Sequence, residues 1–185
     1  KDFIDFSENN IAAHKQKELI ETKSECDAEQ FDDPHFACQY RQQAIEGVTY
    51  RFEVSLTQRV RYAALTSLIT TVEWVLISLK NRATFSVPKK PEGKSDAVHL
   101  LEVFNEKTLL GLVHQIHLIE TLIQVRNCIV HAAGLLASYK HATELRIRLS
   151  GATGINVSNL SFLGDGIEIE AGYLQSVIEE AEHWL

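Results

Sequence analysis

Residues 109–134 read LLGLVHQIHLIETLIQVRNCIVHAAG and carry a broad apolar stripe. The apolar residues recur at intervals of three and four, which is the spacing of one helical face. Gly134 follows them directly, and glycine is common just beyond the last helical turn because it adopts left-handed backbone angles at little cost. The segment predicts a long helix over about 109–133 that packs into the core.

A second long helix is predicted over about 48–79, where apolar residues recur with the same spacing. It exceeds the usual length of a helix in a globular domain, so we expect it to span the whole domain and to be available to a partner. Glu73 is the only acid in it besides Glu53. A buried Glu73 would need a basic partner, and Arg126 on the other long helix is the candidate.

Shorter elements are predicted toward the N-terminus. Ser7 or Asn9 is a candidate cap for a first helix. Residues 26–36 predict an acidic loop, because the Asp32-Asp33-Pro34 sequence within them favours a turn. A short helical piece is expected over 37–45.

Further elements are predicted after each of the two long helices. The proline-containing residues 81–95 predict an exposed loop, and Ser95-Asp96 predict the start of a short helix. After Gly134, helical spacing continues over 135–144, and then residues 145–149 alternate in the manner of a strand. Residues 155–163 and 167–169 flank Gly164-Asp165-Gly166, a hairpin turn signal, and an amphipathic helix is expected over 173–185.

These elements predict a mainly α fold: a helical bundle with two long central helices, a small C-terminal β-hairpin and a final helix. A chain of 185 residues with 45% apolar residues is long enough to bury one core, so a single domain over 1–185 is expected. Within it, 1–47 is an N-terminal helical region, 48–137 the core bundle, and 138–185 the hairpin with the final helix.

Charge and cysteine content limit the function classes. The net charge of −7 argues against indiscriminate nucleic-acid binding, although residues 41–94 carry a net charge of +5 between two segments of −6. No run of eighteen apolar residues is present, so no membrane partner is expected. The three cysteines form no closely spaced pair, which favours free thiols in a reducing compartment, and the cytoplasm is the expected location.

The polar residues Arg126, Asn127 and His131 stand near the end of the apolar helix, where an unpaired charge is costly. At about 100° per residue, Asn127 and His131 share one helical face. Arg126 lies roughly 140° from His131 by the same count. Either the helix loosens near Gly134, or two copies of the chain bring their residues together across a two-fold axis.

A pocket formed in this way would suit RNA cleavage without a metal. A histidine titrates near neutral pH, so His131 is a candidate general acid and base. The guanidinium of Arg126 is suited to stabilising charge on a phosphorane, and Asn127 to orienting the imidazole or the phosphate. In the alternative interpretation, Arg126 and His131 complement the helix macrodipole and cap its last carbonyls.

The Arg126-Asn127-x3-His131 pattern after an apolar helix resembles the Rx4-6H motif of HEPN domains. The resemblance covers about residues 49–137 and implies a helical bundle that dimerises through the motif-bearing helices. It implies a metal-independent endoribonuclease that needs no cofactor and cleaves single-stranded RNA, with Arg126, Asn127 and His131 as catalytic residues. A bacterial defence or toxin–antitoxin setting, with a cognate antitoxin or regulator, is also implied. The alternative within the family is a non-catalytic nucleotide-binding or protein-interaction module.

One residue departs from a subset of that family. HEPN toxins that are regulated by nucleotidyl modification carry a tyrosine two residues after the histidine, and Ala133 occupies this position here. A toxin of that particular type is therefore not expected.

Two other groups of residues are weaker candidates. Lys89, Lys90 and Lys94 make the 81–95 loop basic, which would suit contact with phosphates, although such loops are more often simply solvated. His114 and His117, with Glu120, follow a three-residue spacing that suits metal ligands on one helix. No second ligand pair accompanies them, so no metal is expected.

Overall fold

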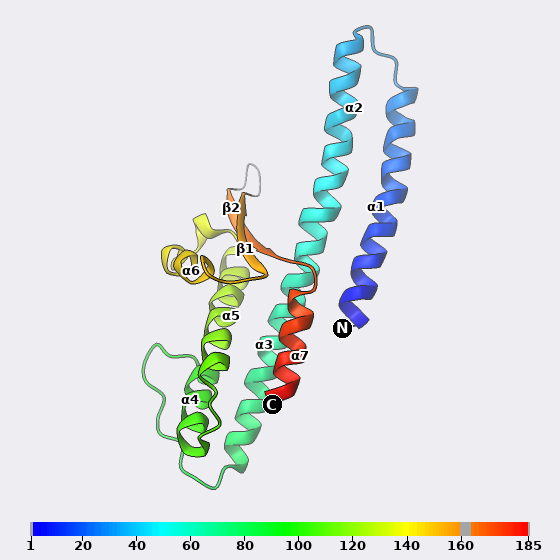
Figure 1. The fold of residues 1–185 in the computed structure, drawn as a ribbon. Helices are drawn as coiled ribbons and strands as arrows, with labels where there is room; N and C mark the ends of the chain where they lie inside the picture. Colours follow the sequence, from blue (N-terminus) through cyan, green and yellow to red (C-terminus); the bar gives the residue numbers. More distant parts are fainter. Residues whose placement is uncertain (1, 160–163, 185) are drawn as a thin grey trace. The chain divides into compact units, whose positions relative to one another are not determined.

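The computed structural model describes residues 2–159 and 164–184. The described chain is mainly helical and contains one small antiparallel sheet (Figure 1). The predicted mainly α fold with a C-terminal hairpin and a final helix is confirmed at this level. The chain divides into two compact units, 1–61 and 62–185. The single-domain organisation stays a prediction.

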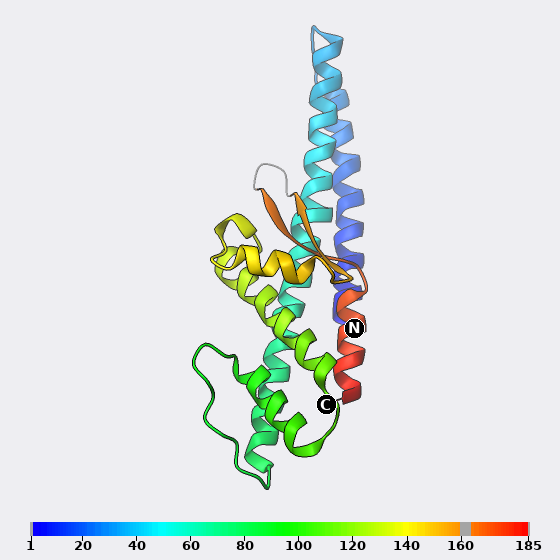
Figure 2. The same ribbon diagram turned by 60° about the vertical axis from the view of Figure 1, so that its left-hand side comes forward.

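The first unit contains a helical hairpin. Helices α1 (Asp2–Ala28) and α2 (Pro34–Thr49) lie side by side in both views (Figures 1 and 2). The Asp33 carboxylate accepts a hydrogen bond from the His35 backbone N–H at 2.8 Å, and Pro34 takes the first helical position. The acidic loop is therefore shorter than the predicted 26–36, because Asp33-Pro34 begins a helix. Likewise, Ser7 and Asn9 lie inside α1 and do not cap it.

Ion pairs link the two sides of this hairpin. Val48 and Phe52 are the buried apolar side chains among the described residues of the unit. Four ion pairs connect α1 with residues 41–61 of the helix that begins with α2. They are Lys15–Glu53, Arg51–Glu18, Arg61–Glu8 and Arg41–Asp27. The first, second and fourth of these pairs each include a side chain that is about half exposed or more, so each of the three contributes about 0–1 kcal/mol.

The predicted helical pieces 37–45 and 48–79 form one continuous helix, Pro34–Arg82. It passes from α2 through the π-helical segment η1 (Tyr50–Leu56) into α3 (Thr57–Arg82). At the start of α3, the Thr57 hydroxyl donates to the Phe52 carbonyl of η1 at 2.8 Å. Gly47, which lies between the two predicted pieces, is inside α2, and a Cβ added there would meet nothing within 4 Å.

By length and composition alone, this continuous helix could cross a membrane, and 22% of its most apolar window is buried. One such helix is a weak indication, because core helices pass the same test. Leu65, Ile69, Val72 and Leu76 form a buried face of α3 at intervals of three and four within the second unit. The expectation of no membrane partner stays a prediction.

The second unit packs helices against the α3 face. Its other elements are α4 (Asp96–Thr108), α5 (Val113–Ala132), the 3-10 turn η2 (Leu136–Ser138), α6 (Ala142–Leu149), strands β1 (Ile155–Asn159) and β2 (Asp165–Ile169), and α7 (Tyr173–Trp184). The Ser95 hydroxyl caps α4, as predicted, by accepting from the Val98 N–H at 3.2 Å. Ile119, Leu122 and Val125 place the predicted apolar stripe of α5 in the core.

The strand predicted over 145–149 is wrong, because these residues belong to α6. Leu145 and Leu149 are buried one helical turn apart, whereas Ile147 between them is 70% exposed. A five-residue alternation fits both periods, so tertiary packing decides between them. Glu144 in the first turn and Arg146 and Arg148 in the last turn also complement the helix dipole.

The C-terminal hairpin is confirmed, but β2 begins earlier than predicted. Ile155 pairs with Ile169, and Asn159 pairs with Asp165, so Asp165 and Gly166 belong to β2 and not to the turn. Of the predicted strand 155–163, residues 155–159 form β1, and 160–163 lie outside the described residues. The predicted final helix is confirmed over α7.

The end of α5 is joined to β2 and to α3 through Gly134. Ala133 ends the helix in the left-handed region at φ 52°, and Gly134 follows at φ 81°. The Gly134 carbonyl accepts from the Ile167 N–H at 2.9 Å, and the Tyr62 hydroxyl donates to the Ile167 carbonyl. A Cβ on Gly134 would lie 2.8 Å from ring carbons of Tyr62. Position 134 thus requires a glycine for two reasons: its positive φ, and the Tyr62 ring that covers it.

We predict that Gly134→Ala destabilises the second unit. An alanine at position 134 would have to adopt a positive φ, and its Cβ would clash with the Tyr62 ring. The free energy of unfolding is therefore expected to fall by about 2 kcal/mol or more. Thermal unfolding should show a midpoint lower by at least about 4 °C. Gly151→Ala is the matched control, because a Cβ there meets nothing within 4 Å and needs no positive φ. Equal midpoints for the two variants would contradict the role of Gly134.

Candidate functional site at the end of helix α5

The three motif residues occupy the last two turns of α5 and point to different surroundings. Arg126 and Asn127 are half-buried, and His131 is exposed in the last turn. Helix α5 remains regular through Ala132. The possibility that the helix loosens before Gly134, which would let Arg126 reach the other two residues, is therefore not observed.

Arg126 makes an ion pair with Glu73 of α3. Its Nη2 donates to Glu73 Oε1 at 3.0 Å, and the two side chains are 27% and 28% exposed. This is the partner expected from the sequence. Arg126 Nε is buried and has no hydrogen-bond partner within the described chain. The pair fastens the motif helix to α3 and orients the guanidinium from one side.

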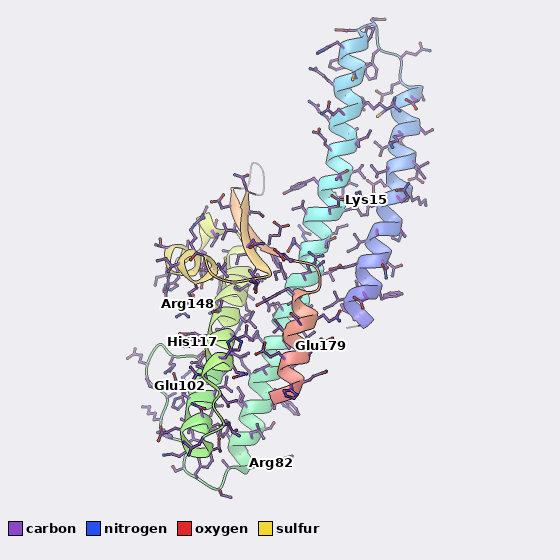
Figure 3. All side chains as sticks on the ribbon, viewed as in Figure 1. Lys15, Arg82, Glu102, His117, Arg148 and Glu179 are labelled. Carbon is purple, nitrogen blue, oxygen red and sulfur yellow. The ribbon has the colours of Figure 1, made fainter. Side chains whose placement is uncertain are left out.

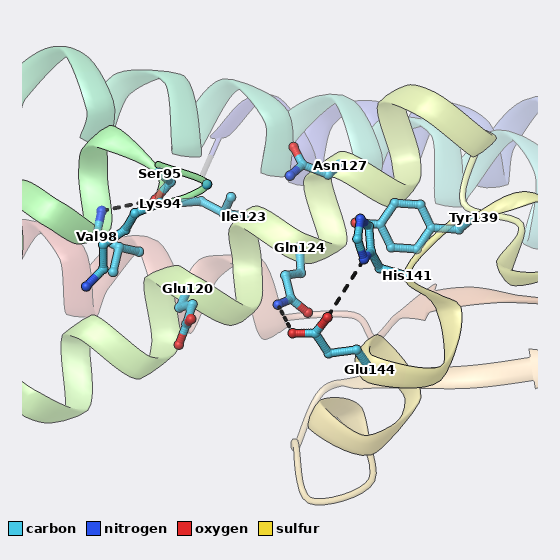
Figure 4. A pocket seen from close by; sticks show the side chains of 11 residues that line it. Lys94, Ser95, Val98, Glu120, Ile123, Gln124, Asn127, Tyr139, His141 and Glu144 are labelled. Carbon is cyan, nitrogen blue, oxygen red and sulfur yellow. Dashed lines mark hydrogen bonds and ion pairs between the residues drawn. The ribbon is translucent and has the colours of Figure 1, made fainter. Parts of the chain in front are cut away.

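Asn127 lines a cavity of about 410 Å³ formed by α5, the start of α4 and the segment around α6 (Figure 4). Neither Arg126 nor His131 lines it. The polar side chains around Asn127 there are Lys94, Ser95, Glu120, Gln124, Tyr139, His141 and Glu144. A single chain therefore does not gather the three predicted catalytic residues into one cavity.

Gln124 and Glu144 form the polar centre of this cavity. Gln124 Nε2 donates to Glu144 Oε1 at 3.3 Å, and His141 Nδ1 lies 3.9 Å from Glu144 Oε2. The Tyr139 and His141 rings meet edge to face, with centroids 5.9 Å apart. Burial raises the pKa of the Tyr139 hydroxyl, with smaller contributions from Cys128 and Glu144. Tyr139 is therefore a neutral hydrogen-bond donor at physiological pH.

Two of the three candidate lysines are engaged by acids of α4. Lys90 Nζ lies 2.9 Å from Asp96, and Lys94 Nζ lies 2.6 Å from Glu102. Lys94 also lines the cavity, whereas Lys89 is exposed and does not. The basic loop thus brings one lysine to the cavity, with its charge already paired.

The metal alternative receives no geometric support among the described residues, where no group of three or more His, Cys, Asp or Glu side chains could hold an ion. His117 is exposed on α5 (Figure 3), and His114 lies 3.5 Å from Glu180. Glu120, the third residue of that spacing, pairs with Arg148 at 2.9 Å.

Cys128 lies between Asn127 and His131 on α5, the helix that carries the motif. It is fully buried and packs as a small core residue. Burial raises the pKa of its thiol to about 11. The thiol is therefore protonated at neutral pH and is not a nucleophile there.

Sequence reasoning missed four residues of the cavity: Gln124, Tyr139, His141 and Glu144. Gln124 had a detectable signal, because it is a polar residue one turn before Asn127 on an apolar helix. The other three come from the η2–α6 segment. Nothing in their spacing indicates that they meet α5, since that contact depends on the chain reversal after Gly134.

A shallow groove runs along α3 beside the motif helix. Tyr62, Ala63, Thr66, Ser67, Thr70, Thr71 and Ile129 line it. The Thr66, Thr70 and Thr71 hydroxyls donate to carbonyls one turn earlier at 2.9 Å, so they present mainly methyl groups outward. Trp74, one turn beyond Thr70 on the same helix, is 68% exposed. The groove is lined mainly by small side chains of α3, together with Tyr62 and Ile129.

Comparison of the chain with protein-family models, with curated proteins and with solved structures found no match.

We predict a measurable coupling between Arg126 and Glu73. In a double-mutant cycle with Arg126→Gln and Glu73→Gln, urea unfolding should give a coupling of about 1 kcal/mol, because both side chains are largely shielded from water. The control is the Lys90–Asp96 pair, whose side chains are 37% and 65% exposed. It should couple by less than about 0.5 kcal/mol. A coupling no larger at Arg126–Glu73 than at the control would contradict a fastening role for the pair.

Proposed function

We propose that the chain is a HEPN-type, metal-independent endoribonuclease that cleaves single-stranded RNA as a homodimer. One observation carries the proposal. Asn127 and an exposed His131 lie in the last turns of an apolar helix, whereas Arg126 is held on another side of the same helix by Glu73. Polar residues divided in this way suit a site to which each of two copies contributes. A bacterial defence or toxin setting rests on the family resemblance alone.

The proposed reaction uses His131 for proton transfer. One imidazole removes the proton from a ribose 2′-hydroxyl, whose oxygen attacks the adjacent phosphorus. The bond from phosphorus to the 5′-oxygen breaks, and a second imidazole protonates that oxygen. The products are a 2′,3′-cyclic phosphate and a 5′-hydroxyl. Proton removal and donation fall to His131 of the two copies, and no redox step or metal is needed.

Arg126 stabilises the negative charge of the phosphorane in this mechanism. Its ion pair with Glu73 uses one edge of the guanidinium and fixes the side chain in position. An arginine that is already ordered loses less conformational entropy when it binds a phosphate. Asn127 orients the phosphate or the imidazole, since it shares a helical face with His131.

The α3 groove supports the dimer part of the proposal. Its hydroxyls are satisfied within the helix, and Ile129 of the motif helix forms part of its wall. Close helix–helix approach favours small side chains, and a large exposed ring such as Trp74 is typical of an interface. A second copy seated there would lie beside the motif residues.

A non-catalytic nucleotide-binding or interaction module is the second candidate. It is favoured by the Arg126–Glu73 pair, which offsets the charge that a phosphate would meet, and by the cavity that contains Asn127 without Arg126 or His131. In this case the motif residues fasten α5 to α3 and line a binding pocket, and the chain binds nucleotides without cutting RNA.

We predict that the chain cleaves single-stranded RNA in the presence of EDTA. His131→Ala should lower the rate by at least about 100-fold, because proton transfer by a positioned histidine contributes that much. The measurement is the appearance of 2′,3′-cyclic phosphate ends on a labelled oligonucleotide.

His117→Ala is the matched control, since it removes an exposed histidine from the same helix. It should cleave at the wild-type rate. Equal rates for wild type and His131→Ala would refute the catalytic assignment. Activity that EDTA abolishes, with loss in His117→Ala, would redirect the site to His114 and His117.

We predict that Thr70→Arg disrupts the dimer. Thr70 is exposed and lines the groove, so the variant monomer should fold normally while a second copy is repelled. Sedimentation should show a dimeric wild type and a monomeric variant, and RNA cleavage should fall with the dimer. Thr143→Arg, at an exposed position of α6 outside the groove, should remain dimeric. A dimeric Thr70→Arg protein would remove the groove from the proposed interface.

A further inference from the structure

The cavity beside Asn127 contains a buried hydrogen-bond acceptor without a donor. Gln124 Nε2 donates to the Glu144 carboxylate. Because an ionised carboxylate only accepts hydrogen bonds, this contact fixes the amide with its nitrogen toward Glu144 and its oxygen the other way. Gln124 Oε1 is buried and has no hydrogen-bond partner in the described chain. A buried acceptor left in this state is costly, so the cavity is suited to a ligand or solvent donor there.

The other polar groups of the cavity also favour a ligand that donates hydrogen bonds. Glu144 is exposed and retains free acceptor positions beside its bond from Gln124. The half-buried Asn127 amide makes no side-chain hydrogen bond within the described residues and supplies both a donor and an acceptor. Lys94 lines the cavity, and its charge is engaged by Glu102. The cavity is therefore poorly suited to a phosphate and well suited to an uncharged group with N–H donors.

Aromatic rings line the same cavity. Tyr139 and His141 present ring surfaces near the Gln124–Glu144 pair (Figure 4). Unpaired nucleobases are commonly held by stacking on such rings together with hydrogen bonds along the base edge. The volume of about 410 Å³ is within the range of small-molecule sites. A planar, donor-bearing ring fits this combination better than an aliphatic amine does.

We propose that this cavity binds a guanine base. Guanine carries two neighbouring N–H donor groups, the ring N1–H and the exocyclic amine, which match the Glu144 carboxylate and Gln124 Oε1. Its O6 acceptor matches the donor side of the Asn127 amide. Adenine, cytosine and uracil each offer only one donor group on the corresponding edge, so none of them satisfies both acceptors.

The guanine can belong to an RNA strand or to a free nucleotide. The assignment to an RNA strand rests on the proposed function. In that case Asn127 would connect the cavity to the cleavage motif, and the bound guanine would select the cleavage position. A free nucleotide does not depend on cleavage. The chemistry of recognition is the same in both cases, and the experiment separates them.

The test is calorimetric titration of the full chain with GMP, AMP, CMP and UMP, which share the same ribose phosphate. GMP should bind one molecule per chain and at least about tenfold more tightly than the others. Glu144→Gln and Gln124→Leu should each weaken GMP binding by about tenfold or more and leave AMP binding unchanged. Glu106→Gln, an exposed change on α4 outside the cavity, is the control and should bind GMP like the wild type.

Similar affinities for all four nucleotides would overturn the proposal, as would a GMP preference that survives both cavity variants. In a second arm, the His131→Ala chain is titrated with an oligouridine that contains one guanosine and with one that contains none. Tighter binding of the first assigns the cavity to RNA, whereas a preference for GMP alone assigns it to a free nucleotide. If the chain cleaves RNA through His131 but shows no guanine preference, only the cavity proposal is refuted. If it prefers guanine but does not cleave RNA, only the proposed nuclease is refuted.

Discussion

The joint at Gly134 is the constraint on which the second unit depends. Gly134 directly follows the end of α5 at a positive φ, its carbonyl accepts a hydrogen bond from the Ile167 N–H, and the Tyr62 ring occupies the space that a side chain on Gly134 would need. The motif helix, β2 and α3 are thereby fixed to one another at a single point. Because the chain reverses immediately after this joint, η2 and α6 return along α5, and the cavity beside Asn127 results from that return.

The Arg126–Glu73 pair fixes α5 to α3 at a second point, two turns before the joint. Two fixed points determine the rotation of α5 about its axis as well as its position. Asn127 then faces the cavity, Cys128 faces the core, and His131 is exposed. The division of the motif residues among different surroundings follows from that rotation.

The sequence predicts the elements of this fold better than it predicts their contacts. Residues 109–133 and 173–185 carry enough helical repeats for their period to be clear, and Glu73 and Arg126 can be paired from the cost of burying a charge. Residues 145–149 are too short for alternation to separate a strand from a helix, and only the burial of Leu145 and Leu149 one turn apart decides it. Tyr139, His141 and Glu144 carry no signal because their meeting with Gln124 depends on the reversal after Gly134.

Under the proposed function, the charge distribution limits how the chain could recognise RNA. The chain has a net charge of −7, and Lys94, the lysine that lines the cavity, is engaged by Glu102, so little phosphate-driven affinity is expected at the cavity. Affinity must then come mainly from stacking and from hydrogen bonds to bases, which salt screens only slightly. Glu144 and Gln124 would repel a phosphate, but they are well suited to a base with N–H donors. An acidic chain that acts on RNA is therefore expected to select single-stranded bases, because a duplex presents mainly its phosphates.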